Sequence, residues 1–275
     1  MSYGIKAAER IAGKTVLITG ASSGIGESIV HQLAAAASGN IRLIVAARRQ
    51  SRLEALKKQL QDQFKAIEVL PLELDVSDYK QIPSKIASLP KEWSEIDILI
   101  NNAGKAQGLD HVGEMKIDDV EGMYFTNVIG MVTLTNTIVP QMKERNSGDI
   151  VMIGSTAGWE SYPGGSVYAS TKACLKSFTE ALRKESISNR LRIIEVDPGA
   201  VETEFSVVRF HGDTDKAKKG YVGYEPMNAD DISEVVVFSL TRRVNCVVAN
   251  SLVLPTNQAG SSFIYGKWET NIQFF

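Results

Sequence analysis

Short apolar runs alternate with longer amphipathic stretches along most of the chain. Several runs, such as LIVAA and IDILI, are apolar at nearly every position, which is typical of strands buried on both faces of a parallel sheet. The runs rich in valine, isoleucine and leucine therefore predict strands over Thr15–Thr19, Ile41–Ala46, Ile67–Pro71, Ile96–Asn101, Ile150–Ser155, Leu191–Val196 and Asn245–Leu254.

The amphipathic stretches between these runs predict helices. The first of them places Ile25, Ile29 and Leu33 at four-residue steps, so that their side chains share one face of a helix. Strands and helices that alternate over 275 residues predict right-handed crossovers and a doubly wound α/β sheet. Because the chain has no solenoid-length repeat, low-complexity run or Pro/Gly linker, we expect a single domain over residues 1–275.

The stretch from residue 202 to residue 227 departs from this alternation. It follows Pro198–Gly199 and carries several glycines and a proline, which disfavour long regular elements. A connection of this length in a compact domain is often a lid or a binding loop. We therefore interpret residues 202–227 as a lid over a substrate site, with a pair of surface helices that have no role as the alternative.

The overall composition narrows the class of protein. Hydrophobic residues make up 44% of the chain and charged residues 23%, and the net charge is -2. A chain so close to neutral gives no electrostatic basis for binding nucleic acid. The histidines, His31, His111 and His211, are scattered along the chain, and without a cluster of ligands we expect no metal site.

The expected location is the cytoplasm. The chain has two cysteines, Cys174 and Cys246, and without a CxxC pair they indicate a reducing compartment. The polar arm around Lys6 and Arg10 is not followed by the apolar run of a secretory leader. No run approaches the roughly 18–20 apolar residues that a membrane span needs, so we expect no membrane partner.

The first motif with chemical content is TVLITGASSGIGESIV, in which a predicted strand ends, glycines follow and a helix begins. Glycine permits positive φ and close approach of the backbone to a ligand, and a helix N-terminus offers unpaired N–H groups to a pyrophosphate. The spacing GxxxGxG differs from the more familiar GxGxxG, and tight strand–helix packing also uses glycine. The strand before and the helix after favour a nucleotide site. Its expected contacts are Gly20, Ser22, Ser23, Gly24, Ile25 and Gly26.

The end of the second predicted strand indicates which nucleotide this is. A site selective for NAD tends to place Asp or Glu about 20 residues beyond the glycines, on the ribose 2′-hydroxyl. Here the strand ends in two alanines followed by Arg48 and Arg49. Two guanidinium groups favour a 2′-phosphate, so we expect NADP(H), with a solvated basic helix start as the alternative. Asp75 is placed either to accept from an adenine amine or to cap the next helix.

The candidate catalytic residues lie in the middle of the chain. Tyr168 and Lys172 are four residues apart in a predicted helix, so they share one face. A neighbouring ammonium and an oxidised nicotinamide would both lower the pKa of a tyrosine. Ser155 ends a predicted strand, where doubly wound folds place ligands. Asn127 lies within a largely apolar helix, where an amide usually has a specific partner.

Taken together, these motifs resemble those of the short-chain dehydrogenase/reductase family. TGASSGIG, NNAG, Asn127, Ser155, YASTK and PG occur in that family's order and spacing across nearly the whole chain. The resemblance implies a Rossmann-type seven-stranded parallel sheet and a tetrad of Asn127, Ser155, Tyr168 and Lys172. In such enzymes the tyrosine is the general acid/base and the serine orients the substrate. The lysine binds the nicotinamide ribose and lowers the tyrosine pKa, and the asparagine holds a relay water.

The resemblance also implies an assembly and further cofactor contacts. It points to a homotetramer with the helices of Asn127 and Tyr168 at a subunit interface. Thr203 takes the place of a threonine that meets the nicotinamide carboxamide. Besides Tyr168 and Lys172, the implied cofactor contacts are Asp75, Val76, Asn102, Ala103, Gly104, Pro198, Gly199, Val201 and Thr203.

A narrower resemblance covers most of the chain. KAAERIAGKTVLITGASSGIG, AARRQSRLEALKK, NNAGKAQG, VDPGAVETEFSVVRF and LPTNQA are similar to the fungal NADP-dependent serine/3-hydroxy acid dehydrogenases, which are also described as broad carbonyl reductases. Two features depart from it. Trp159 stands where a charged residue is expected, and the C-terminal tail, residues 256–275, ends in SSFIYGKWETNIQFF, which matches no family motif.

The sequence therefore predicts hydride transfer between NADP(H) and a small hydroxy acid or its carbonyl partner. In the lid, Arg209 is the candidate cation for the substrate carboxylate, with Phe205 and Trp159 as apolar walls. Alternatively, Arg209 lies on the surface and pairs with Glu202 or Asp213.

Three alternative functions stay open at this point. The first is a broad-range ketone and aldehyde reductase. The second is a nucleotide-sugar epimerase or dehydratase, which shares YxxxK but usually has a larger C-terminal domain. The third is a non-catalytic NADP-binding regulator, which would not need to keep Tyr168 and Lys172.

Overall fold

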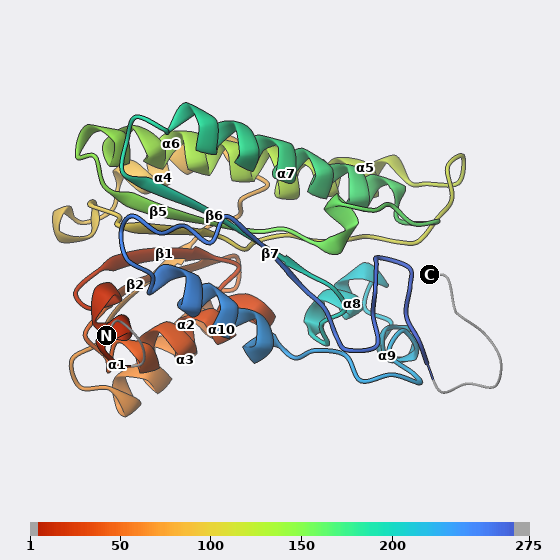
Figure 1. The fold of residues 1–275 in the computed structure, drawn as a ribbon. Helices are drawn as coiled ribbons and strands as arrows, with labels where there is room; N and C mark the ends of the chain where they lie inside the picture. Colours follow the sequence, from red (N-terminus) through yellow and green to blue (C-terminus); the bar gives the residue numbers. More distant parts are fainter. Residues whose placement is uncertain (1–4, 267–275) are drawn as a thin grey trace.

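Seven parallel strands form the centre of the fold in the computed structural model, which describes residues 5–266. Their order across the sheet is β3-β2-β1-β4-β5-β6-β7, so the chain leaves β1 in one direction and later continues from β4 in the other (Figure 1). The strands are β1 (Thr15–Thr19), β2 (Arg42–Ala47), β3 (Glu68–Glu73), β4 (Ile98–Asn101), β5 (Gly148–Ile153), β6 (Leu191–Pro198) and β7 (Asn250–Val253).

Helices cover both faces of this sheet. On one face lie α2 (Gly24–Ala36), α3 (Gln50–Gln63) and α10 (Ala229–Leu240), and on the other α4 (Ile82–Ala87), α6 (Met131–Glu144) and α7 (Ser166–Glu185) (Figure 1). α5 (Ile117–Tyr124) runs into α6 through a π-helical segment, η4 (Phe125–Gly130). The short α1 (Ile5–Ala8) precedes β1. The predicted single-domain Rossmann-type fold is confirmed.

The strands contribute to two separate cores because successive side chains point to opposite faces. Val16 and Ile18 of β1 pack with the α2, α3 and α10 side, whereas Leu17 packs with the α4, α6 and α7 side. All three are fully buried. This arrangement explains why the strands are apolar at nearly every position.

The predicted strand ends differ from the observed ones at two places that matter for the site. β5 ends at Ile153 rather than Ser155, because the Ser155 hydroxyl accepts the Ala157 N–H and starts a 3-10 turn, η5 (Thr156–Gly158). The strand predicted over Asn245–Leu254 is reduced to β7, because pairing with β6 begins only at Asn250.

The stretch predicted to be irregular, residues 202–227, contains two short helices, α8 (Glu204–Arg209) and α9 (Thr214–Lys219). Thr203 caps the first and Asp213 caps the second, by accepting the backbone N–H groups of Phe205 and Lys216. Both helices lie beyond the carboxyl ends of the strands (Figure 1). We keep the name lid for residues 202–227 below, and their role over a substrate site stays a prediction.

The chain then returns to the same end of the sheet. After β7 it folds back on itself, with an isolated bridge between Gln258 and Ile264. The remainder of the tail predicted over residues 256–275 lies outside the described residues from 267 onward. Among residues 5–266, no helix is both long enough and apolar enough to cross a membrane.

Candidate active site

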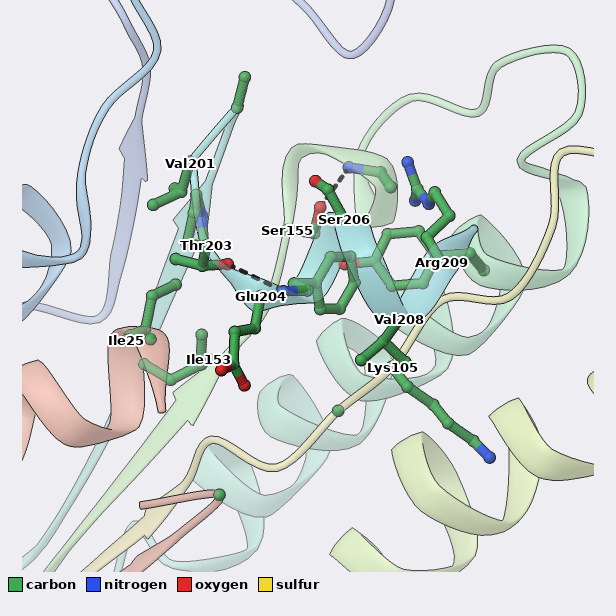
Figure 2. Close-up of a pocket in the computed structure, with 18 of the residues that line it drawn as sticks. Ile25, Lys105, Ile153, Ser155, Val201, Thr203, Glu204, Ser206, Val208 and Arg209 are labelled. Carbon is green, nitrogen blue, oxygen red and sulfur yellow. Dashed lines mark hydrogen bonds between the residues drawn. The ribbon is translucent and has the colours of Figure 1, made fainter. Parts of the chain in front are cut away.

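A cavity of about 710 Å³ opens at the carboxyl ends of the strands. Gly20, Asn102 and Ser155, which follow β1, β4 and β5, line it together with Pro198 at the end of β6. β1 and β4 flank the point where the strand order reverses, and open α/β sheets bind ligands at that point. Figure 2 shows Ser155, Thr203 and Arg209 around this cavity.

The glycine-rich turn forms one wall, and its glycines have no space for a larger residue. Gly20 and Gly24 have φ angles of +68° and +57°, a region that disfavours other residues. A Cβ on Gly26 would lie 2.3 Å from the Gly20 carbonyl oxygen, and one on Gly24 would lie 3.2 Å from Thr203 Cβ. The turn is therefore a tight backbone cradle at the N-terminus of α2, which is the geometry that receives a pyrophosphate.

Thr19, at the end of β1, ties this turn to the NNAG segment. Its hydroxyl accepts the backbone N–H groups of Asn102 (3.1 Å) and Ala103 (3.0 Å). The Asn102 side chain donates in return to the Thr19 carbonyl oxygen (2.8 Å). Two loops that are distant in sequence are thus fixed side by side at the point where the strand order reverses.

The two arginines after β2 have different surroundings. Arg49 donates to the hydroxyls of Ser22 and Ser23 (3.0 and 2.8 Å) and pairs with Glu204 at the start of α8 (2.9 Å). Arg48 also lines the cavity, is exposed, and has no hydrogen bond or ion pair among the described residues. Its guanidinium is therefore free to bind an incoming anion, whereas Arg49 stabilises the turn and holds the lid.

Asp75 and Val76 close the cavity on the β3 side. The Asp75 carboxylate accepts the N–H and the hydroxyl of Ser77 (2.9 and 2.7 Å), so it fixes the local turn and caps no helix directly. Gly130 passes close by, because a Cβ there would lie 2.0 Å from the Val76 carbonyl oxygen.

Tyr168, Lys172 and Ser155 converge at the centre of the cavity. The Ser155 hydroxyl lies close enough to the Tyr168 phenol to act on its pKa. Lys172 Nζ donates to the Ile153 carbonyl oxygen (2.8 Å) and lies 5.9 Å from the centre of the Tyr168 ring. The i, i+4 spacing on α7 thus brings a phenol and an ammonium to the turn that follows β5.

Burial has the largest effect on the pKa values at this centre. Burial raises the pKa of Tyr168, although the hydrogen bond from Ser155 and the charge of Arg209 act to lower it. Burial likewise lowers the pKa of Lys172 to about 8. In the protein by itself, the cost of burying a phenolate exceeds the attraction of nearby cations. The predicted lowering of the tyrosine pKa includes the charge of an oxidised nicotinamide and stays a prediction.

Arg209 reaches from the lid over the catalytic tyrosine candidate. Its guanidinium carbon lies 5.2 Å from the centre of the Tyr168 ring and 5.7 Å from that of Phe205, and one nitrogen donates to the Tyr162 hydroxyl (2.8 Å). Arg209 Nε is buried without a hydrogen-bond partner. Among the described residues it pairs with neither Glu202 nor Asp213, the partners that the surface alternative requires.

Comparison with known proteins places this chain in a family. Residues 14–213 match the family model described as short chain dehydrogenase. The chain belongs to the short chain dehydrogenase family. This match confirms the family that the sequence motifs resemble, and with it the predicted fold.

Individual members of the family are similar over nearly all of the chain. A protein named NADP-dependent 3-hydroxy acid dehydrogenase from Schizosaccharomyces pombe is 55% identical over 258 residues, 94% of this chain and 98% of that one. One of the same name from Escherichia coli (strain K12) is 40% identical over 248 residues, 89% and 97% of the two chains. The solved closed form of a serine dehydrogenase complexed with NADP+ has a TM-score of 0.83 and 37% identity, and the match covers 94% and 99% of the chains.

Three residues predicted for the site of this short chain dehydrogenase lie outside the cavity. Gly26 packs beneath the turn against Gly20. Asn127 uses its whole amide on the protein: its oxygen accepts the Lys105 N–H (2.9 Å), and its nitrogen donates to the Lys105 carbonyl oxygen (2.8 Å) and the Thr171 hydroxyl (3.0 Å). Asn127 therefore fixes the segment after NNAG, and its assignment as the residue that holds a relay water stays a prediction.

Trp159 is the third of these residues. Its ring is 52% exposed and lies 4.1 Å from Lys176 Nζ, while its indole N–H donates to Asp197 (2.9 Å). These two contacts turn the ring away from the cavity, so it does not form the apolar wall that we predicted. Phe205 does line the cavity, edge-on to Tyr168 with 5.7 Å between ring centres.

Other cavity residues had no recognisable signal in the sequence. Tyr162 lies in a Pro/Gly turn, and Gln258 lies in the tail. The Gln258 amide accepts the Ala200 N–H (2.8 Å) and donates to the Gly260 carbonyl oxygen (2.8 Å). Only the folded chain shows that the tail supports the loop after β6.

Proposed function

We propose that this chain is an NADP(H)-dependent oxidoreductase that transfers hydride between the nicotinamide and a small 3-hydroxy acid or serine-like alcohol, or the corresponding carbonyl compound. The observation that carries the proposal is the meeting of Tyr168, Ser155 and Lys172 in one cavity with the glycine cradle and the unpaired Arg48. The names of the relatives from Schizosaccharomyces pombe and Escherichia coli support the same substrate class.

The residues present fit such a cofactor. The turn from Gly20 to Ile25 leaves a cradle that any Cβ on Gly20 or Gly24 would disturb, and Arg48 is placed for the 2′-phosphate. Lys172 and Thr203 would hold the nicotinamide end, where the bound cofactor supplies or accepts the hydride. The remaining contacts that we assign to it are Asp75, Val76, Asn102, Ala103, Gly104, Pro198, Gly199 and Val201, all of which line the cavity.

The proton chemistry belongs to Tyr168. Because its pKa is raised, the phenol carries its proton at neutral pH and can give that proton to a substrate carbonyl oxygen during reduction. In the reverse direction the same oxygen takes the proton from the substrate hydroxyl. Ser155, which lines the cavity beside the phenol, orients the substrate oxygen between the two hydroxyls. Lys172 supplies a positive charge that is present below pH about 8 and is lost above it.

A substrate panel tests this proposal. The purified protein would be supplied with NADP+ and serine or other 3-hydroxy acids, and with NADPH and uncharged or aryl ketones, while NADPH absorbance is followed. We expect turnover with 3-hydroxy acids, and turnover with ketones as well if the chain is also a broad carbonyl reductase. Cofactor binding without turnover on any substrate would favour the non-catalytic regulator.

Replacing Arg209 with Met is expected to lower kcat/KM for a 3-hydroxy acid while largely sparing an uncharged ketone of similar size. Arg209 lies beside Tyr168, and its Nε has no partner on the protein, so it is placed to bind a substrate carboxylate. A charge-assisted contact of this kind contributes roughly 1.5–3 kcal/mol, so we expect about a ten- to hundredfold loss for the acid. The ratio of the two kcat/KM values is the measurement.

Lys216→Met provides the matched control for this prediction. Lys216 also lines the cavity from the lid, and its Nζ lies 5.1 Å from the centre of the Phe210 ring. We expect this variant to keep the wild-type ratio between acid and ketone. Equal losses on both substrates in Arg209→Met would mean that Arg209 only supports the lid, and an acid-specific loss in Lys216→Met would assign the carboxylate to that residue.

We further propose that the enzyme is a cytoplasmic homotetramer. Tyr124, Phe125 and Ile129, at the junction of α5 and η4, are 38%, 39% and 38% exposed, and large hydrophobic side chains exposed on one short segment favour an interface. Light scattering at micromolar concentration is expected to give the mass of four 30.0 kDa chains. Ile129→Glu should lower that mass, whereas Ile187→Glu, at an 87% exposed position after α7, should not. A monomeric wild-type mass would refute the assembly.

A further inference from the structure

Two buried carboxyl groups lie directly behind the catalytic turn, and the function proposed above does not use them. Glu195 and Asp197 are two residues apart on β6, so both side chains point to the same face of the sheet. Each residue is only 1% exposed. Both face Gly154, where a Cβ would lie 1.9 Å from Asp197 Oδ1 and 3.4 Å from Glu195 Oε1. Glycine at 154 is therefore required for the pair to exist.

Asp197 holds both ends of the turn that carries Ser155. One carboxylate oxygen accepts the Ser155 backbone N–H (3.1 Å), and the other accepts the indole N–H of Trp159 (2.9 Å). On the opposite side Lys172 donates to the Ile153 carbonyl oxygen. The position of the Ser155 hydroxyl relative to Tyr168 thus depends on a buried negative charge.

Electrostatic repulsion favours a single negative charge on this pair. Two carboxylates this close and this buried repel each other, so the second ionises only at a higher pH, and below that pH the pair shares one proton. Asp197 accepts from the N–H groups of Ser155 and Trp159 and faces the charge of Lys172. Among residues 5–266, Glu195 accepts from Asn250 alone (2.9 Å), and its Oε1 has no donor. A proton on Glu195 lets that carboxyl donate to Asp197. Burial and the Asp197 charge raise the pKa of Glu195 to about 7.

From this geometry we infer that Asp197 is a positioning residue for the reaction. It fixes the Ser155 turn and is the buried counter-charge of Lys172. Glu195 carries the proton that limits the pair to one negative charge. The inference rests on the function proposed above. The charged and titratable groups that face the pair are Lys172 and Tyr168 from α7, and Arg183 at the C-terminal end of the same helix.

These neighbours determine the direction in which the pair shifts the pKa of Lys172. Negative charge on Asp197 and Glu195 raises the pKa of Lys172 against the effect of burial, which lowers it. Removing that charge makes Lys172 lose its proton at a lower pH. Because Lys172 acts only when it is protonated, the alkaline limb of the activity profile would move to lower pH.

The test is the double variant Glu195→Gln/Asp197→Asn, which keeps side-chain size and a backbone acceptor but removes both charges. With NADPH and an uncharged ketone, we expect the alkaline fall of kcat/KM to occur about one pH unit lower than in the wild type. On the alkaline limb of the wild-type profile, kcat/KM of the variant should therefore be roughly tenfold below the wild-type value. Asp97→Asn is the matched control, because Asp97 also accepts a backbone N–H, that of Thr15, but at the amino ends of the strands, away from the cavity. It should leave the profile unmoved. An unmoved profile in the double variant would overturn the inference.

A second measurement stays informative if the double variant does not fold. Infrared difference spectra of the wild-type protein should contain the band of a protonated carboxyl that disappears as the pH rises through about 7. Trp159→Phe removes one donor from Asp197 at an exposed ring, so the band should persist to higher pH. If these spectra contain no carboxyl band that titrates, the inference that the pair shares a proton is wrong. These spectra need no turnover, so failure of the proposed function would show separately, as a wild-type protein that binds NADPH but reduces nothing.

Discussion

Replacing Tyr168 with Phe is expected to lower turnover by roughly 10²–10⁴-fold, the range that a positioned general acid contributes. The substitution removes only the phenolic oxygen, which gives its proton to the substrate during reduction. The aromatic ring remains, with its edge contact to Phe205, so the fold and the affinity for NADPH should survive. Single-turnover kinetics together with an NADPH titration by fluorescence measure the two effects separately.

Tyr162→Phe is a matched control for this variant. Tyr162 is a second buried phenol in the same cavity, and its hydroxyl accepts from Arg209 rather than from Ser155. Burial also raises its pKa, so a high pKa alone does not distinguish the two tyrosines. We expect Tyr162→Phe to lose far less turnover than Tyr168→Phe. Near-normal turnover in Tyr168→Phe, or equal losses in both variants, would contradict the assignment of Tyr168.

Replacing Arg48 with Asp is expected to raise the KM for NADP by about ten- to hundredfold and to change the KM for NAD little, since a charge-assisted contact is worth roughly 1.5–3 kcal/mol. Arg48 lines the cavity with its guanidinium unpaired, whereas Arg49 is already bound to Ser22, Ser23 and Glu204. The new carboxylate would repel a 2′-phosphate and could accept from a ribose hydroxyl. The two KM values, measured with one substrate, give the comparison.

Lys58→Asp separates this local effect from a change in net charge. Lys58 lies on the exposed surface of α3, the helix that follows Arg48 and Arg49, and does not line the cavity. The variant changes the charge by the same amount, so its ratio of KM for NADP to KM for NAD should stay at the wild-type value. An unchanged ratio in Arg48→Asp would show that the 2′-phosphate is held elsewhere.

The fold was largely predictable from the sequence because burial on both faces leaves a strong apolar pattern. β1 is apolar at its central positions, since each side chain meets one of the two cores. β7 was predicted too long because an edge strand is defined by where its single neighbour pairs with it, and the local pattern does not contain that register. The helices of residues 202–227 entered the prediction only as the alternative, because their formation depends on the short capping residues Thr203 and Asp213 more than on an apolar face.

The site residues were predictable where a short sequence motif carries the chemistry. They were not predictable where contacts join segments that are distant in sequence. The glycine turn and the pair Tyr168 and Lys172 are local in sequence, and the structure brings them together. The surroundings of Asn127 and Trp159 are not local: each side chain finds partners far along the chain, Thr171 for the first and Asp197 for the second. The effect of burial, which raises the Tyr168 pKa, was not visible in the sequence for the same reason, because burial depends on the whole fold.

The most direct test of the central claim follows the hydride itself. The protein would be incubated with the carbonyl form of a small 3-hydroxy acid and NADPH that carries deuterium at its transferable position, and the product would be analysed by mass spectrometry. Transfer within the cavity of Tyr168 and Ser155 predicts a hydroxy acid with one deuterium on the new carbinol carbon, formed at a rate that Tyr168→Phe lowers by roughly 10²–10⁴-fold. A hydroxy acid without deuterium, or no product from protein that binds NADPH, would contradict it.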